Sequence, residues 1–336
     1  MLVLLVIMFA SCNKTLKLPD VGVERKIVLL GELIANDSAY MRAGQSVPLT
    51  SSSSLKFELL NGLTITMEDN TGTSVLLNGY IDDLSSTLYT LPYSSVSKIQ
   101  AGNTYNITAT HIKMGTAKAT VQIPDAFNAI TTSIENTLYA SDSAIKINIQ
   151  IHDPSASQNY YVIEAVKQIM DVKGFFKYNG NWLLIASNKY LYDQEKANGN
   201  IEERYDTTYH KNYLRNLVYT EDINAENAIV KSNTEANRRI LLRDRAFNGQ
   251  SYNTTIYIAI DLMDSLYQKG RLLLQIKSVS QPYFMYLKRY DEQIDQGGMN
   301  TLGQPVKVEG NITNGVGIVG GVYKNEYIIR HDNWTF

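Results

Sequence analysis

The chain has 336 residues, of which 44% are hydrophobic and 19% charged, a composition ordinary for a folded protein with sizeable cores. This length suggests about two domains. Lysine and arginine number 31 against 33 acidic residues, which gives a net charge of −2 at pH 7. Such a balance supplies no general attraction to phosphate backbones, so nucleic acid is not an expected partner.

The N-terminus combines an apolar segment with the single cysteine of the chain. MLVLLVIMFA carries no charge and is followed by Ser11 and Cys12. It is shorter than the ~20 apolar residues of a membrane span and is typical of a signal-peptide core. Because small residues precede Cys12 directly, as in a bacterial lipobox, we predict a lipoprotein signal peptide over 1–11 and lipid attachment at Cys12. The alternative is an ordinary cleaved signal that leaves a free thiol, and neither version predicts a disulfide.

Residues 12–25 are expected to form a tether, followed by an N-terminal β-sandwich domain over 26–125. Alternation at period two places Tyr105, Ile107, Ala109 and His111 on one face of a strand. Glycine-containing and serine-rich turns separate further strands expected at 26–34, 55–59, 63–68, 74–78, 87–91 and 117–123. Short strands at this spacing are typical of an immunoglobulin-like or transthyretin-like sandwich.

A C-terminal β-rich domain with helical segments is expected over 126–336. Alternating isoleucines at 145–151 predict a half-buried strand, and others are expected at 160–166, 182–186, 255–261 and 271–278. Helices are predicted at 223–243 and 282–295; in the second, apolar and aromatic residues recur three to four apart after Pro282. The predicted fold class is therefore mainly β, with two sandwich domains and helical insertions in the second.

Residues 171–220 have an unusually aromatic composition, with ten aromatic residues in fifty. Tyrosine and tryptophan combine apolar area with a polar group and are favoured at contact surfaces. We therefore predict a partner-binding surface that includes Tyr178, Trp182, Tyr190 and Tyr192. The alternative is that these rings only cover the edge of the sandwich.

Near the C-terminus, Gly315, Gly317 and Gly320 have the spacing of a dinucleotide fingerprint, and Gly321 follows. That fingerprint requires a helix that begins on the glycines and an acidic residue about 20 positions later. The residues after Gly321 have strand composition instead. We therefore predict structural glycines at a turn, a bulge or a close backbone approach, with no nucleotide bound.

No catalytic constellation is evident. The four histidines lack metal-binding spacing, and the neighbouring residues of His152-Asp153 and of His331-Asp332 would face opposite sides of a strand. Asp291 and Asp295, one helical turn apart, and the basic run 238–245 are interpreted as solvated faces. The sequence thus predicts no catalytic residues, no metal, no cofactor and no enzymatic activity.

Several segments together resemble one family: Cys12 with its preceding residues, DRAFNGQSY (244–252), LLLQIKSVSQPYFMYLKRY (272–290) and QPVKVEGNITNGVGIVGG (304–321). They are similar to the domain-of-unknown-function 4249 family of Bacteroidetes envelope lipoproteins. The resemblance implies an outer-membrane lipoprotein, often encoded near TonB-dependent transporters, with no established activity. Which face of the outer membrane it occupies stays open.

Two non-enzymatic functions follow as expectations. The first is a binding or accessory module of the cell envelope that serves such a transporter. The second is a structural, fimbrillin-like surface subunit, because fimbrial proteins of this phylum also look like lipobox-bearing chains with two sandwiches. The C-terminal glycine motif favours the first.

Overall fold

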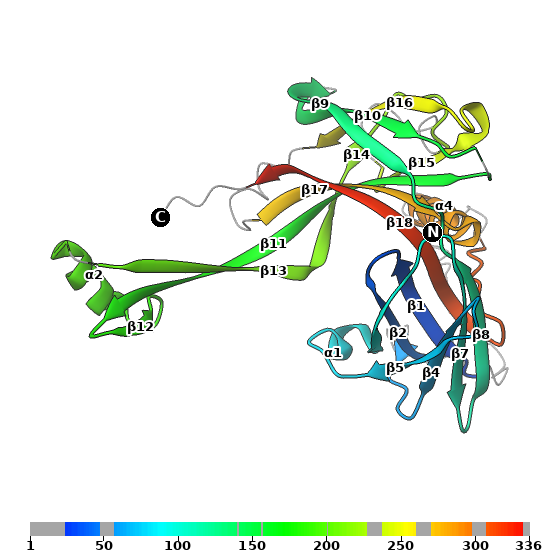
Figure 1. The fold of residues 1–336 in the computed structure, drawn as a ribbon, viewed down its shortest axis with the longest axis horizontal. Coiled ribbons are helices and arrows are strands. Elements are labelled where there is room, and N and C mark those ends of the chain that lie inside the picture. Colours follow the sequence, from blue (N-terminus) through cyan, green and yellow to red (C-terminus); the bar gives the residue numbers. More distant parts are fainter. Residues whose placement is uncertain are drawn as a thin grey trace, which may run out of the picture.

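The computed structural model describes residues 24–47, 57–139, 141–155, 157–199, 201–226, 237–259, 270–297 and 307–331. The side chains of 210–213, 295–297 and 330–331 are not described. Within these ranges the protein is mainly β, as predicted, and its strands form one large sheet and one smaller sheet (Figure 1). The predicted signal peptide 1–11 and Cys12 lie outside the described residues, as does most of the predicted tether.

The N-terminal half contributes eight strands and one short helix to the described structure. They are β1 (Ile27–Ile34), β2 (Ser38–Ser46), β3 (Phe57–Glu58), β4 (Thr64–Asp69), β5 (Ser74–Gly79), α1 (Ser85–Leu88), β6 (Leu91–Lys98), β7 (Thr104–His111) and β8 (Gly115–Gln122). Their apolar faces enclose one core. The alternation predicted for β7 and β8 is confirmed, because Tyr105, Ile107 and Ala109 are buried while their neighbours face outward.

The strand predicted at 87–91 is wrong. Residues up to Leu88 belong to α1, Tyr89 adopts a left-handed conformation, and β6 begins only at Leu91. The cause is a polar contact distant in sequence: the buried guanidinium of Arg42 binds Asp82 and the carbonyl oxygen of Thr90, and so fixes the ends of this loop. Strand β2 was not predicted because small and polar residues interrupt its apolar pattern.

The C-terminal half supplies the smaller sheet, in the order β14-β16-β10-β9, and the rest of the larger one. The strands of the smaller sheet are β9 (Asn128–Tyr139), β10 (Asp142–His152), β14 (Val218–Tyr219) and β16 (Ser251–Ala259). The others are β11 (Tyr160–Tyr178), β12 (Asn181–Leu184), β13 (Glu203–Asn216), β15 (Ile240–Arg243), β17 (Gly270–Val279) and β18 (Gly315–His331). The strand predicted at 145–151 is confirmed, and the alternating isoleucines of β10 share a second core with residues of β11, β15 and β17.

In the described part of this half the helices are α2 (Lys189–Ala197), η1 (Asp244–Ala246) and α4 (Gln281–Gly297). Helix α4 confirms the prediction at 282–295 and covers the opposite face of the large sheet through Tyr283, Phe284 and Leu287. The helix predicted at 223–243 is wrong where the structure describes it, and 227–236 lie outside the described residues. Residues 240–243 form β15, in which Ile240 and Leu242 enter the second core while Leu241 enters the core under α4.

Strand β18 joins the two halves. It pairs in parallel with β1 and antiparallel with β17, so a strand from residues 126–336 completes the sheet of residues 26–125. Its side chains enter all three cores: Val319 the N-terminal core, Val322 the core under α4, and Tyr327 the core of the smaller sheet. The two-domain, immunoglobulin-like interpretation is therefore not confirmed, and the boundary near residue 125 stays a prediction.

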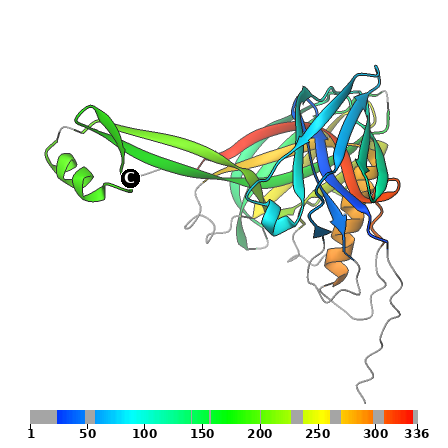
Figure 2. The ribbon, with the colours of Figure 1, turned by 90° about the horizontal axis from the view of Figure 1, so that it is seen from below.

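A long arm projects from this body (Figures 1 and 2). Strand β11 has 19 residues, but its pairing with β17 extends only to Ile169, which lies opposite Gly270 at the start of β17. Beyond that point β11 continues with β13 as a ribbon, which carries β12 and α2 at its far end. We call residues 170–209 the arm. The predicted aromatic surface lies on its tip.

Candidate functional site

The arm tip is a small layered structure. An Asn-Gly turn at Asn179 and Gly180, both with positive φ, connects β11 to β12. Strands β12, β11 and β13 form a three-stranded sheet, because Phe175 and Phe176 of β11 pair with β12 on one side and β13 on the other. Helix α2 packs against one face of this sheet and leaves the other face open. A two-stranded ribbon is only marginally stable by itself, so this local core explains how the tip keeps its shape.

On the covered face, Tyr192 of α2 packs edge-on against the buried ring of Phe176. Its hydroxyl donates to Glu203, which also accepts from Tyr205. Hydrogen bonds from Tyr205 and Tyr192 lower the pKa of Glu203, while burial and the Glu203 carboxylate raise that of Tyr205. The sequence placed Tyr192 on the contact surface together with the other three rings. This placement is wrong, because Tyr192 is a buried anchor of α2.

The open face of the tip carries stacked aromatic and cationic side chains. The guanidinium of Arg204 lies 5.0 Å from the ring centre of Phe175 and 5.1 Å from that of Trp182. The ammonium group of Lys177 lies 5.9 Å from Trp182 and pairs with Glu202 at 2.8 Å. Arg204 also pairs with Asp206 at 3.0 Å. The partly exposed ring of Trp182 therefore lies between two cations.

Tyr190 and Tyr178 are the other two predicted contact residues. Tyr190, on the outer side of α2, is 78% exposed, and its hydroxyl accepts a hydrogen bond from Gln194. Tyr178 is half-buried at the end of β11. The arm tip thus presents Trp182 and Tyr190 on different sides, and acidic and basic side chains accompany both.

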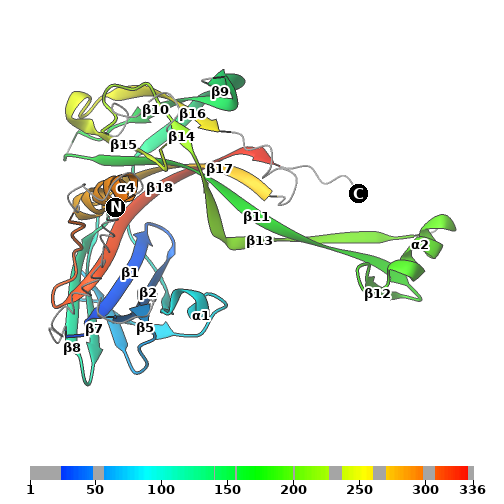
Figure 3. The same cartoon turned by 180° about the vertical axis from the view of Figure 1, so that it is seen from behind.

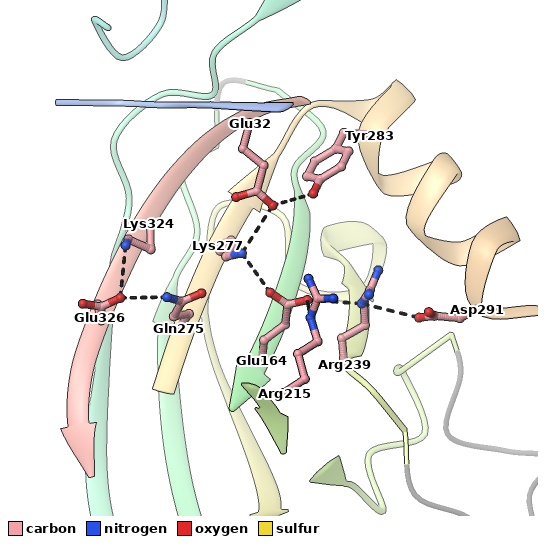
Figure 4. Close-up of polar contacts among 10 residues, drawn as sticks. All are labelled: Glu32, Glu164, Arg215, Arg239, Gln275, Lys277, Tyr283, Asp291, Lys324 and Glu326. Atoms are coloured by element: carbon pink, nitrogen blue, oxygen red, sulfur yellow. Dashed lines mark hydrogen bonds and ion pairs between the residues drawn. The ribbon is translucent and has the colours of Figure 1, made fainter. Parts of the chain in front are cut away.

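At the root of the arm lies a buried cluster of charges, which we call the root network (Figure 4). Glu164 of β11 is its centre. Its carboxylate lies 2.8 Å from the ammonium of Lys277 on β17 and 3.2 Å from the Nε atoms of Arg215 on β13 and Arg239 before β15. The side chain of Glu164 is 3% exposed, and that of Arg239 is 1% exposed.

The root network extends to β1 and α4. Lys277 lies 3.5 Å from Glu32 of β1, which accepts a hydrogen bond from the hydroxyl of Tyr283 on α4. The Nε atom of Arg239 lies 3.5 Å from the carboxylate of Asp291, which follows Tyr283 later in α4. Three carboxylates and three cations therefore tie together the strands that leave for the arm, the central sheet and the covering helix.

The central carboxylate of the root network stays ionised at neutral pH. Burial alone would raise the pKa of Glu164, but Lys277, Arg215 and Arg239 outweigh it and bring the pKa to about 2. Burial raises the pKa of Tyr283 well above its ordinary value, and the charge of Glu32 adds to this. A general base needs a pKa near the working pH, so Glu164 is unsuited to that role. The contacts of the root network instead join the base of the arm, on β11 and β13, to the central sheet and α4.

The sequence reading missed the root network and misplaced two of its members. The basic run 238–245 is not simply a solvated face, because Arg239 is buried. Asp291 is also buried rather than solvated, and the side chain of Asp295 is not described. A signal existed: Glu164 interrupts the apolar run 160–166, Lys277 follows the apolar residues of β17, and buried charges are almost always paired.

The glycine run lies within β18, so the prediction of a turn there is wrong. The prediction of a close backbone approach fits the geometry. A Cβ atom at Gly317 would lie 2.0 Å from the carbonyl oxygen of Leu29, and one at Gly321 would lie 2.0 Å from that of Gln122. At Gly320 it would meet the ring of Tyr283 at 2.4 Å, and at Gly315 the carbonyl oxygen of Ile27 at 2.8 Å. Strand β18 continues to His331, so no helix begins on these glycines.

The remaining chemistry of the described residues is sparse. His152 hydrogen-bonds Ser251 through Nδ1 at 2.7 Å, while the side chain of His331 is not described. No group of three or more histidine, cysteine or acidic side chains in the described ranges is arranged to hold a metal ion. None of the described helices is long and apolar enough to cross a membrane.

A family model described as "Domain of unknown function (DUF4249)" matches residues 15–328. The chain belongs to this family. The match includes the arm, the root network and the glycine run of the DUF4249 chain. Among curated proteins, none matches it significantly.

Among solved structures, a similar chain is the Enterococcus faecalis MSCRAMM ACE, described as binding its ligands by the collagen Hug model. The two are 9% identical over 89% of the DUF4249 chain and 93% of that chain, with a TM-score of 0.16. At this TM-score the likeness carries no argument about fold or function.

Proposed function

We propose that this DUF4249 chain is a non-enzymatic binding module of the cell envelope, which contacts a partner protein through the arm tip. The observation that carries the proposal is the arm itself: a ribbon that leaves the body, ends in a small core and displays Trp182 and Tyr190. Tryptophan, tyrosine and arginine are the residues that most often dominate binding energy at protein interfaces. The buried ion pairs of the root network also fix the base of the arm, which would keep the contact surface at its tip in one orientation.

We further propose that the chain is a lipoprotein of the outer membrane and that its partner is a TonB-dependent transporter. Support for the anchor comes from Cys12, the only cysteine, which directly follows an uncharged apolar segment and two small residues. Support for the transporter comes from the family resemblance alone. The arm would then reach across to the transporter while the lipid holds the body at the membrane.

We also infer that residues 26–125 and 126–336 are two sandwich units of the immunoglobulin-like or transthyretin-like kind. Support for this division is that the first core is formed mainly by residues before 125, with Val319 added from β18, and the second core by residues after 125. The shared strand β18 implies that the units fold together rather than independently.

Lipid attachment is tested by labelling cells with a clickable fatty acid. The natural chain should incorporate the label, and the Cys12→Ser variant should not, because a thioether requires the cysteine sulfur. Equal labelling of both chains would rule out an anchor at Cys12.

Partner binding is tested with Trp182→Ala and Tyr190→Ala against the proposed partner, a TonB-dependent transporter purified in detergent. Each change should weaken binding by ~2 kcal/mol, roughly 30-fold in affinity, because it removes a rigid aromatic anchor. Tyr290→Ala is the matched control, since this ring is also exposed but lies on α4, away from the arm.

Circular dichroism should show the natural fold for all three variants. Full-strength binding by folded tip variants would show that the contact surface lies elsewhere on the molecule.

A further inference from the structure

A second displayed surface lies in the N-terminal half, on the loop Tyr80–Thr90, which we call the aromatic loop. It runs from the end of β5 through α1 to β6. Ile81 is 83% exposed, and Tyr80, Leu88 and Tyr89 are exposed as well. Within the described residues of this loop the only charged side chains are Asp82, which is paired, and Asp83. The loop therefore offers the solvent an apolar, tyrosine-bearing surface.

The aromatic loop is held rigidly from beneath. Arg42, buried in β2, donates to both oxygens of Asp82, at 2.8 and 3.1 Å, and to the hydroxyl and carbonyl oxygens of Thr90, at 2.9 and 2.7 Å. The hydrogen bonds from Arg42 lower the pKa of Asp82 to about 2, so the pair stays charged at neutral pH. Ser85 adds a further hydrogen bond to Asp82. The loop is thus fastened at both ends by one guanidinium.

The backbone conformation of Tyr89 is a second indication that the aromatic loop has a fixed shape. Its φ of 52° and ψ of 36° place it in the left-handed region, which bulky residues rarely adopt. Such a conformation is strained and persists only where the surrounding structure imposes it. Here it turns the chain from α1 into β6 and leaves the Tyr89 side chain exposed instead of adding it to the core.

The arm and the aromatic loop lie on the same side of the molecule. In Figures 1, 2 and 3 the arm projects from the side of the body on which α1 lies, and it extends well beyond α1. A flat membrane that approached along the arm would therefore meet the charged tip, with Lys177, Arg204 and Lys189, before it reached the loop. An irregular protein surface can touch both. The geometry therefore favours a protein over a lipid bilayer as the occupant.

We propose that the aromatic loop is a second contact point for the same partner protein that binds the arm tip. This rests on the proposed function. The matching surface on the partner would be apolar, with hydrogen-bonding groups for the hydroxyls of Tyr80 and Tyr89. Two contacts on one rigid body reinforce each other, since binding at one raises the effective concentration at the other. The arm alone would set the position of the partner, and the loop would fix its rotation.

The test uses the full chain and the same purified TonB-dependent transporter. The double variant Ile81→Ser/Leu88→Ser removes the exposed apolar surface without touching Arg42 or Asp82, so its melting temperature should equal that of the natural chain. We expect its affinity to fall by roughly tenfold or more. The matched control is Ile112→Ser, in the β7–β8 turn, where the side chain is 95% exposed. It should bind at full strength.

The outcomes separate this inference from the proposed function. Loss of binding in the tip variants but not in the loop variant would overturn the loop contact alone. Unchanged binding in the tip variants would overturn the proposed function, whatever the loop variant does. Weakened binding in both, with the control unaffected, is the result we expect.

A second measurement tests the membrane as occupant. Because Cys12 is the only natural cysteine, Ile81→Cys introduces a thiol that can be labelled with a fluorescent dye. With the lipoprotein in phosphatidylethanolamine and phosphatidylglycerol vesicles, we expect doxyl-labelled lipids to leave this dye unquenched, and the added transporter to protect it from iodide. Quenching by the doxyl lipids without the transporter would place the loop in the bilayer and overturn the proposal.

Discussion

Replacing Gly317 by alanine is expected to destabilise the protein by ~3 kcal/mol or to prevent folding. Two independent costs combine at this position. The residue has a φ of +112°, where an L-residue with a side chain is strained, and the new Cβ atom would lie 2.0 Å from the carbonyl oxygen of Leu29. Both obstacles are backbone, so no side chain can move aside. Because β18 joins the two halves of the chain, the loss should appear in a single transition of the whole molecule.

Substitutions at two other glycines measure the two costs one at a time, the backbone strain at positive φ and the steric overlap of the new Cβ atom. At Gly180, φ is +82° but a Cβ atom would meet nothing within 4 Å, so Gly180→Ala should cost only ~1 kcal/mol. At Gly320 no positive φ occurs, but the Cβ atom would meet the ring of Tyr283 at 2.4 Å, so Gly320→Ala measures steric overlap with a side chain. Free energies of unfolding in urea should place Gly317→Ala below both. A Gly317→Ala chain as stable as Gly180→Ala would contradict the close approach of β18 to β1.

Strands with one buried and one solvated face could be predicted from the sequence. The isoleucines of β10 and the alternation in β7 indicate their elements because each strand separates a core from water. The helix α4 was predictable for the same reason, with a period of 3.6. Strand β15 was not, because Ile240, Leu241 and Leu242 are all buried between two cores and show no alternation. A short run that is apolar on both sides resembles a buried helix as much as a strand.

Long-range pairing is the second limit. Nothing near Gly315–His331 indicates that this strand lies beside Ile27–Ile34, almost 290 positions earlier in the chain. The same holds for the root network, whose members come from β1, β11, β13, β17, α4 and the residues before β15. The aromatic composition of the arm was visible in the sequence, but its projection was not. Projection depends on where β17 stops pairing with β11, which is a property of the partner strand.

Removing the central carboxylate of the root network, in Glu164→Gln, is expected to destabilise the protein by about 3 to 5 kcal/mol. Lys277 and Arg239 would remain buried without their main counter-charge, and an uncompensated buried charge is strongly unfavourable. The matched control is Glu326→Gln on β18, which is separated from β11 by β17 in the same sheet. Glu326 pairs with Lys324 at 3.0 Å and accepts from Gln275, but it is exposed, so its loss should cost under ~1 kcal/mol. Similar losses in the two variants would mean that Glu164 does not hold the network together.

The same carboxylate should make stability depend on pH in a defined window. The pKa of Glu164 falls from 4.5 when unfolded to about 2 when folded, so its contribution is fully present above 4.5 and is lost as the pH falls toward 2. The depression corresponds to about 3 kcal/mol. Free energies of unfolding measured between pH 6 and pH 2 should therefore fall less steeply for Glu164→Gln than for the natural chain.

Because Glu164 joins β11 to Arg215 of β13, acid should also loosen the root of the arm. Spin labels on the arm tip and on β8 should then report a broader range of separations at pH 2, where the folded carboxylate begins to take up a proton, than at pH 7 in the natural chain. Glu164→Gln should give the broad distribution already at pH 7, and a narrow one there would mean that other contacts set the direction of the arm.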